Sequence, residues 1–250
     1  MNRRNWRESP TAVSHGYIIE RTILTKQVDS KPGREGAFLL NMDSFARGYL
    51  EGGVTTVPES HERIQEVFYV VRGRGEFDGG GVKRDVGEGD AIMVPAGVEH
   101  VLKNLTEEPL EVLTVREELP EGVEPKTRQP VIRNYREFPL SQGHWVHLGR
   151  RLLDANDGLT SITGVFMVTI EPMQTADSHA HAPGTDELWY TLEGSAVHVV
   201  GQEMCVQTEG DVVGPPPGVP HSNINHTDKP FRAFLFSWSE AQARRLLVMA

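Results

Sequence analysis

The sequence predicts an all-β protein made of two tandem antiparallel β-barrel or jelly-roll domains. Short runs rich in β-branched and aromatic residues, such as residues 67–71, alternate with turns that contain glycine and proline. Helical periodicity is almost absent from the chain. One pattern of glutamate, glycine and histidine occurs twice, which indicates that a single domain has been duplicated.

The repeat keeps the same spacing in both copies, at an offset of 121 residues. From its glutamate, each copy reaches a glycine after 7 residues, a second glycine after 23 and a histidine after 34. A period this long is typical of a duplicated domain rather than of a solenoid unit. The matching positions are Glu66, Gly73, Gly89 and His100 in the first copy, and Glu187, Gly194, Gly210 and His221 in the second.

The N-terminal part of the chain is polar and precedes the first copy of the repeat. We expect residues 1–35 to form an arm that lies over a neighbouring surface. Two apolar runs between residues 17 and 24 predict a short edge strand within this arm. The first barrel domain is expected to occupy residues 36–124.

The join between the two domains is marked by composition. Residues 117–130 are rich in proline and charge, as is typical of a linker, so we place the boundary near residue 125. The second barrel domain is therefore expected at residues 125–250. Near its end, Ser239 followed by Gln242 resembles a capping box and predicts a short C-terminal helix.

Composition excludes several classes of partner. The chain has 35 acidic and 25 basic residues and a formal charge of −10, which opposes the phosphate neutralisation on which nucleic-acid binding depends. The single cysteine, Cys205, cannot form an internal disulfide and fits a reducing compartment. No segment has the apolar length of a signal peptide or a membrane span. These features predict a soluble cytoplasmic protein that binds neither nucleic acid nor membrane.

The second copy of the repeat contains a candidate metal site. His179 and His181 are two residues apart, so both rings would point to the same face of an extended strand. Glu187 and His221 can converge on them from other strands. Three imidazoles and one carboxylate suit a divalent transition metal such as Mn, Fe, Co, Ni, Cu or Zn. Four protein ligands leave open positions on an octahedral ion, where a substrate can bind.

These residues resemble the two conserved motifs of the cupin superfamily. The family's first motif contains His-x-His, a glutamate and a glycine, and the second contains two glycines, a proline, a histidine and an asparagine. Two departures occur in the first motif: Met173 replaces the leading glycine, and five residues rather than four separate His181 from Glu187. The second motif fits without a gap. The matching residues are His179, His181, Glu187 and Gly194 in the first motif, and Gly210, Pro216, Gly218, His221 and Asn225 in the second.

The resemblance identifies the chain as a bicupin, a chain with two tandem cupin domains. It implies a jelly roll in each half, and it implies that His179, His181, Glu187 and His221 are metal ligands. Bicupins commonly pair through exchanged N-terminal strands. We therefore expect a symmetric homodimer or a higher even oligomer, with the N-terminal arm covering a strand edge of a neighbour.

The first copy of the repeat contains a second, altered ligand set. Its spacing matches the family motif, but Glu59 stands in place of the first histidine. Two carboxylates and two imidazoles can bind a hard divalent ion such as Mn or Fe, and the alternative is a degenerate pocket without metal. The residues of this possible second site are Glu59, His61, Glu66 and His100.

Strand alternation predicts the lining of the pocket in the second half. If the side chains of Glu187 and His221 point inward, so do those two and four residues further along each strand. A wet, polar pocket beside the metal is expected, with Trp189 either as one wall or as a residue of the barrel core. The predicted lining residues are Trp189, Thr191, Asn223 and Asn225.

Three functions remain open on the sequence alone. The first is a metalloenzyme for a small polar substrate (a carboxylate, diketone, catechol or sugar acid), with dioxygenase chemistry favoured over isomerase, lyase or aminohydrolase chemistry. The second is a non-catalytic module that binds a sugar or another small ligand, because a fold does not determine a function. The third is a structural or storage role, against which the complete ligand set of the second half argues.

Overall fold

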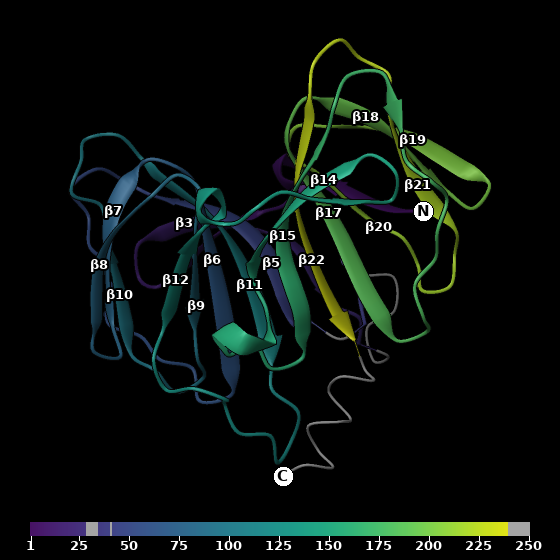
Figure 1. Ribbon diagram of the computed structural model, residues 1–250. Coiled ribbons are helices and arrows are strands. Elements are labelled where there is room, and N and C mark those ends of the chain that lie inside the picture. Colours follow the sequence, from purple (N-terminus) through teal and green to yellow (C-terminus); the bar gives the residue numbers. More distant parts are fainter. Residues whose placement is uncertain (29–34, 41, 240–250) are drawn as a thin grey trace.

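The computed structural model describes residues 1–28, 35–40 and 42–239 as two sets of sheets side by side, antiparallel except for the short pairing of β3 (Ile18–Lys26) with β4 (Ala37–Leu39) (Figure 1). The C-terminal helix that we predicted beyond Ser239 lies outside the described residues. We call the set of sheets that contains β6 (Ile64–Arg72) the first half and the set that contains β17 (Thr185–Glu193) the second half. No helix within the described ranges has the length and apolar character needed to cross a membrane.

The first half contains an eight-stranded sheet and a three-stranded sheet. The larger sheet has the order β12-β9-β6-β11-β5-β3-β2, with β4 added beside β3, and the smaller has the order β10-β7-β8. The strands are β2 (Thr11–Ser14), β3 (Ile18–Lys26), β4 (Ala37–Leu39), β5 (Ser44–Leu50), β6 (Ile64–Arg72), β7 (Arg74–Gly79), β8 (Val82–Gly87), β9 (Asp90–Val94), β10 (His100–Lys103), β11 (Leu110–Glu118) and β12 (Val131–Asn134).

The second half repeats this architecture with a seven-stranded and a four-stranded sheet. Their orders are β1-β20-β17-β22-β15-β14-β13 and β16-β21-β18-β19. The strands are β1 (Asn2–Asn5), β13 (Ser141–Gly143), β14 (His147–Leu153), β15 (Ile162–Ile170), β16 (Gln174–Thr175), β17 (Thr185–Glu193), β18 (Ser195–Val200), β19 (Glu203–Thr208), β20 (Asp211–Gly214), β21 (His221–Asn225) and β22 (Phe231–Ser239). Single 3-10 turns lie at η1 (Trp6–Glu8), η2 (Tyr135–Glu137) and η3 (Ala155–Asp157). The predicted all-β fold is confirmed.

Each half includes one strand that lies outside its own stretch of the sequence. β1 pairs with β20, so the first residues of the chain complete the large sheet of the second half. Reciprocally, β12, which follows the first repeat, pairs with β9 of the first half. Asn5 and Asn134 end these two strands and cap η1 and η2 in the same way. The edge of β20 is therefore covered by the same chain, and the expectation that the arm covers a neighbouring chain stays a prediction.

The strand that we expected at the edge of the arm is longer and lies inside a sheet. β3 pairs with β5 on one side and with β2 on the other. The sequence pattern was misleading because the charged pair Glu20 and Arg21 interrupts the apolar runs. In the structure, Glu20 is buried against Arg116, with the nearest charged atoms 2.8 Å apart, and Arg21 bonds to the carbonyl of Ser9 at 2.7 Å.

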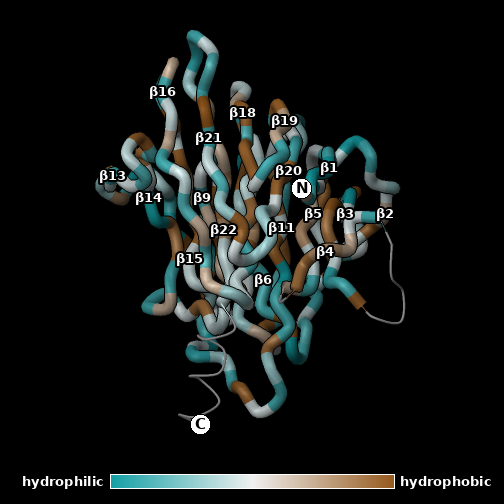
Figure 2. The backbone as a smooth tube through the Cα atoms, turned by 90° about the vertical axis from the view of Figure 1, so that its right-hand side faces the viewer, coloured by the Kyte–Doolittle hydropathy of each residue, from teal (hydrophilic) through white to brown (hydrophobic). Residues whose placement is uncertain are grey.

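The two halves share one hydrophobic core between their large sheets. Phe45 of β5 contacts Tyr190 of β17 and Phe236 of β22, with ring centroids 5.4 and 4.9 Å apart. Tyr69 of β6 lies 4.9 Å from Phe234 of β22. In Figure 2 the hydrophobic segments follow the strands, whereas several of the loops at their ends are hydrophilic. Burial of apolar surface at this interface holds the halves together.

A buried carboxyl group lies at the same interface. Glu117, near the end of β11, is fully buried, and its Oε1 accepts a hydrogen bond of 2.8 Å from the backbone N–H of Ser161. Burial raises the pKa of Glu117 to about 7, although bonds from the backbone of Ser161 and Ile162 oppose this shift. A carboxyl whose pKa is raised in the folded state stabilises the fold in its protonated form. This stabilisation is complete below the ordinary pKa of 4.5 and is lost as the pH rises through about 7.

Glutamine does not ionise, so Glu117→Gln should lack the loss of stability that the parent shows as the pH rises. From pH 5 to pH 8 we expect the free energy of unfolding of the variant to rise relative to that of the parent by about 3 kcal/mol. Urea denaturation of both proteins at the two pH values measures this difference, because both contain the same histidines. Glu118→Gln, at the exposed next position, is the control and should follow the parent. A Glu117→Gln variant that follows the parent at both pH values would contradict the prediction.

Candidate metal centre and cavity of the second half

The second half brings the four predicted ligands together by backbone pairing and a tight turn. His179 and His221 face each other across an antiparallel bridge, where each backbone N–H donates to the other's carbonyl at 3.1 and 2.8 Å. The carbonyl of His181 accepts a bond of 3.0 Å from the N–H of Gly218, whose φ of 78° is the left-handed turn that favours glycine. Glu187 reaches the cluster from β17.

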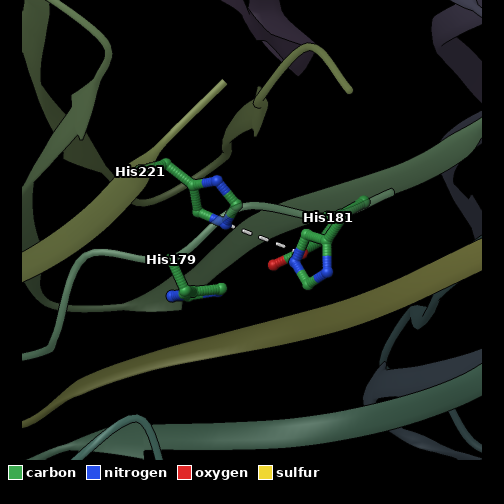
Figure 3. Close-up of side chains that lie close together, drawn as sticks. His179, His181 and His221 are labelled. Carbon is green, nitrogen blue, oxygen red and sulfur yellow. Dashed lines mark ion pairs between the residues drawn. The ribbon is translucent and has the colours of Figure 1, made fainter. Parts of the chain in front are cut away.

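The ligand atoms of these four residues all lie within 4.8 Å of one another. The ring centroids of His179 and His221 are 4.3 Å apart, and that of His181 lies 5.2 Å from each. Figure 3 shows the three rings gathered in one place between strands. Glu187 Oε2 contacts His181 Nε2 and lies 3.7 Å from His221 Nε2. His221 and Glu187 are buried, whereas His179 and His181 are half-buried.

Electrostatics hold the carboxylate in its charged form. Burial opposes ionisation of Glu187, but the neighbouring His221 and His181 outweigh it and lower the pKa of Glu187 to about 2. Burial lowers the pKa of His179 and of His181, and repulsion from His221 adds to both shifts. Burial also acts to lower the pKa of His221, but Glu187 outweighs it and raises that pKa.

The donor set fits a divalent metal ion. His221 Nδ1 lies 3.1 Å from the carbonyl of Val219, which assigns the N–H to that side of the ring and leaves Nε2 free to bind an ion. His221 Nε2 is buried without a hydrogen-bond partner among the described residues. Three imidazole nitrogens and one carboxylate oxygen are ligands of first-row divalent metals. The chain therefore has the residues of a divalent metal site in its second half.

A cavity of about 400 Å³ opens onto this cluster. Trp189 lines it and donates its Nε1–H to Glu187, and His147 packs against Trp189 with ring centroids 5.0 Å apart. None of the described residues that line the cavity is Lys or Arg. Besides the ligands and Trp189, the lining consists of apolar Phe166, Val168 and Leu235, polar Ser141, Thr163, Thr185, Ser237 and Ser239, the glycines Gly143 and Gly149, and His144 and His147.

Two of these histidines were not recognised in the sequence. His144 stacks on the ligand His179, with ring centroids 3.6 Å apart, and its Nδ1 lies 3.5 Å from Asp177 Oδ1. Burial, with repulsion from His144 and His179, lowers the pKa of His147 to about 4. The sequence does contain a signal for this segment: N-W-R-E at residues 5–8 recurs as N-Y-R-E at residues 134–137, and His15 and His144 follow at the same distance.

A third unrecognised histidine lies deeper in the second half. His198 of β18 is fully buried, and its Nδ1 lies 3.1 Å from Gln207 Oε1. Burial, the largest cause, lowers the pKa of His198 to about 4, and repulsion from His221 acts in the same direction. The corresponding first-half position is Phe77, so the interior of the second half is more polar than that of the first.

Of the four predicted pocket residues, the structure places Trp189 in the cavity lining and the other three elsewhere. Asn225 Nδ2 donates to the carbonyls of Ile170 and Lys229 at 2.9 and 2.7 Å, so it holds a turn together. Thr191 and Asn223 are fully buried but lie outside the cavity lining. All four side chains are buried, but strand alternation gives no information about the position of a residue along its strand relative to the cavity.

The corresponding space in the first half is filled. When the strand registers of the two halves are compared, Gly149 of the second-half cavity occupies the position that Glu20 has in the first half. In the same way, Ser237 occupies the position of Arg116. Arg116 makes two bonds to Glu20, at 3.0 and 2.8 Å, and one to Glu66 at 2.9 Å. Of these two corresponding positions, only the one in the second half opens into a cavity within the described part of the chain.

Comparison with known proteins agrees with this architecture. Residues 48–116 and 166–237, more than half of the chain, match the sequence profile of the cupin domain family. An uncharacterised protein of Methanocaldococcus jannaschii is 30% identical over 70 residues, or 28% of this chain and 56% of the relative. The chain thus matches about half of the length of that relative.

Solved structures with the same fold include two bacterial proteins. A mutant of oxalate decarboxylase from Bacillus subtilis superposes with a TM-score of 0.72 at 19% identity, over 95% of this chain and 76% of that one. A glyoxylate-induced protein from Pseudomonas aeruginosa gives a TM-score of 0.74 at 18% identity, over 90% and 83% of the two chains. The Bacillus enzyme contains Mn(II) centres. At these identities the likeness establishes the fold alone.

Proposed function

This chain belongs to the cupin domain family, and from that premise we propose that it is a metal-dependent dioxygenase whose second half binds a small molecule through two oxygen atoms. One observation carries the proposal. The cavity of about 400 Å³ is lined both by the ligand side chains of His179, His181 and Glu187 and by the apolar side chains of Phe166, Val168 and Leu235. Such a cavity can bind a molecule that has both a chelating edge and an apolar body.

The ligand set leaves room for the substrate. His179, His181, Glu187 and His221 would hold the ion, and four protein ligands leave two positions open on an octahedral metal. When bound, a divalent metal supplies Lewis acidity and, for a redox-active ion, a partner for dioxygen. The side chains keep this arrangement in place, because Trp189 bonds to Glu187.

The charge of the cavity favours a particular class of substrate. A dicarboxylate such as oxalate would introduce two negative charges where none of the described lining residues is Lys or Arg. A catechol or a 1,3-diketone brings less charge, chelates through two oxygens and has an apolar part for Phe166 and Val168. The volume also lies within the range of about 300–1,000 Å³ that is typical of small-molecule sites.

The proposed reaction needs no co-reactant besides dioxygen. A dioxygenase of this class breaks one carbon–carbon bond of its substrate and places both oxygen atoms of O2 in the products. The four electrons that reduce O2 come from the bond that is broken and from the oxidised carbons, so no external reductant is consumed. The chain's own part is to exclude bulk water and to orient the substrate against the ligand wall.

An oxygen electrode tests the proposal directly. The protein is loaded separately with Mn, Fe, Co, Ni, Cu or Zn and offered catechols, 1,3-diketones, keto acids and oxalate. We expect O2 consumption with at least one catechol or diketone and a redox-active metal, and none with oxalate. Turnover that proceeds equally well without O2 would instead indicate an isomerase, lyase or aminohydrolase. Saturable binding without turnover would indicate a binding module.

His147 is expected to orient the substrate. Its Nε2 is buried without a hydrogen-bond partner among the described residues, and its low pKa keeps the ring neutral at pH 7. Ile18 occupies the corresponding position in the first half. His147→Ile should reduce kcat/KM about 10- to 100-fold, because one hydrogen bond to the substrate is lost.

Two measurements separate this role from a structural one. The metal content of His147→Ile should equal that of the parent, because His147 is not among the ligands. His147→Gln retains a hydrogen-bonding group and should recover part of the lost activity. Equal kcat/KM values for His147→Ile and the parent would show that His147 does not contact the substrate.

A further inference from the structure

The first half contains a second cluster of histidine and carboxylate side chains, and its backbone matches that of the second half. Glu59 pairs with His100 across an antiparallel bridge, as His179 pairs with His221. The backbone of the first family motif is thus preserved, but Glu59 offers a carboxylate where the second half has an imidazole. A carboxylate thus replaces the imidazole at this position while the backbone bridge is kept.

A histidine from outside the motif reaches the same cluster. His15 lies in the loop between β2 and β3 and is buried, with a left-handed φ of 50°. Its Nε2 lies 3.4 Å from Glu66 Oε2. The Nε2 atoms of His61 and His100 lie at the same distance of 3.4 Å from this oxygen. Three imidazole nitrogens therefore surround one carboxylate oxygen.

The 3.4 Å between Glu66 Oε2 and each of the three Nε2 atoms is the spacing of neighbouring ligand atoms around a metal. With metal–ligand bonds of about 2.1 Å, neighbouring ligand atoms lie about 3.0–3.4 Å apart, depending on whether the geometry is octahedral or tetrahedral. The ligand atoms of His15, Glu66 and His100 lie within 4.8 Å of one another, and so do those of His15, Glu59 and His61. His15 is the member that both groups share.

Two imidazole nitrogens that face Glu66 have no hydrogen-bond partner among the described residues. The Nε2 atoms of His61 and His100 are buried and accept or donate no hydrogen bond within the described part of the chain. His100 Nδ1 lies 3.1 Å from the carbonyl of Val98, which assigns its N–H to that side and directs a free lone pair into the cluster. Buried polar atoms without partners destabilise a fold, and a cation at their centre would satisfy them together.

The surroundings close the cluster and fix its carboxylate. Glu66 Oε1 accepts a bond of 2.9 Å from Arg116 Nε, which turns Oε2 toward the three imidazoles. Arg116 also binds Glu20, and Ser14, next to His15, donates to Glu20 at 2.9 Å. The rings of Phe68 and Phe77 pack on the imidazoles at centroid distances of 5.5 Å from His15 and 6.2 Å from His100.

From these contacts we propose that the first half holds a closed, structural metal site in which His15 supplies the imidazole that Glu59 does not. The other ligands are His61, Glu66 and His100. Four protein ligands in a closed site are typical of structural zinc, so the class of ion is Zn²⁺ or a divalent metal with the same preference for nitrogen. This site is independent of the reaction that we propose for the second half.

The site would connect the N-terminal segment to the first half. His15 follows β2, and the residues before it lead back to β1, which completes the large sheet of the second half. An ion at His15 would therefore stabilise a strand pairing in the other half. We expect a chelator to lower the melting temperature of the full chain, and Zn²⁺ to restore it.

Metal counting on full-length variants tests the proposal. After loading with Zn²⁺ and removal of the excess, the parent should retain about two equivalents by elemental analysis. His15→Asn should retain one, because asparagine tolerates a left-handed backbone but is too short to reach the cluster. Glu59→Gln should keep both. His144→Asn, the same substitution in the corresponding loop of the second half, is the matched control and should also keep both.

Two results would overturn the proposal. One is loss of an equivalent in Glu59→Gln but not in His15→Asn, which would make the motif carboxylate the ligand. The other is a parent protein that retains only one equivalent of Zn²⁺ and loses it in His221→Ala, which would place the single ion in the second half. Without Zn²⁺, the melting temperature of His15→Asn should be close to that of the parent, which would confirm that the variant is folded. The additional stabilisation by Zn²⁺ should be smaller in His15→Asn than in the parent.

Discussion

His221→Ala should leave the second half without its metal ion while the chain remains folded. His221 is almost fully buried at the start of β21, and its ring is oriented by the carbonyl of Val219. Its removal reduces the nitrogen donors of the site from three to two. Loss of a partner that only orients a ligand lowers metal affinity about 10- to 100-fold, so loss of the ligand itself should cost at least about 100-fold.

Activity should fall with the metal, and stability should change little. The hydrophobic core between the large sheets contains none of the four ligands, so we expect only a modest loss of melting temperature beyond the lost contribution of metal binding. Elemental analysis, melting temperature and turnover are measured on His221→Ala, on His181→Ala and on the control His226→Ala. His226 is exposed just beyond the end of β21 and is not a ligand. Unchanged metal content in both ligand variants would refute the assignment of the site.

The double variant Gly149→Glu, Ser237→Arg should abolish substrate binding without removing the metal. The two substitutions introduce into the second half the residue types of Glu20 and Arg116, which occupy the corresponding space in the first half. A Cβ at Gly149 would meet only Ser141, with the nearest atom at 3.6 Å, so the backbone can accept a side chain there. The new carboxylate and guanidinium would occupy the cavity and neutralise each other. The second half would then resemble the first.

We expect substrate affinity to fall at least about 100-fold in the double variant, since the cavity that buries the ligand is lost. Calorimetric titration with the best substrate of the oxygen-electrode panel measures the effect, and elemental analysis should still find the ion of the second half. Ser237→Ala is the comparison variant, because it removes only a hydroxyl and should change affinity about 10-fold at most. Undiminished binding by the double variant would mean that the substrate does not use this cavity.

The sequence predicted the fold and the four residues that the structure brings together in the second half, because both depend on short segments. The distances from Glu187 to Gly194, Gly210 and His221 are set by hairpins and turns that repeat in the first half. Glycines at these turns have left-handed φ values of 80° at Gly194 and 85° at Gly210, so their positions are visible as residue types. Local geometry of this kind can be read from a single chain.

The roles of His15 and His144 were missed because they depend on contacts between distant segments. Their loops correspond at an offset of 129 residues, whereas the main motifs correspond at 121. The burial of the charged side chains of Glu20 and Arg116 was missed for the same reason. Glu20 appeared to interrupt a strand, and only its contact with Arg116, 96 residues away, shows that it can be buried.

The reciprocal exchange of β1 and β12 has a consequence for synthesis on the ribosome. Arg3 of β1 binds Asp211 of β20, a partner 208 residues later in the chain. At about 5–20 residues per second, the first strand waits roughly 10–40 s for the strand that it completes. Its arginines, Arg3 and Arg4, disfavour pairing with foreign strands during this interval. A nascent chain that stops after the first half would expose β1 with no β20 to receive it, and such a fragment is expected to recruit chaperones.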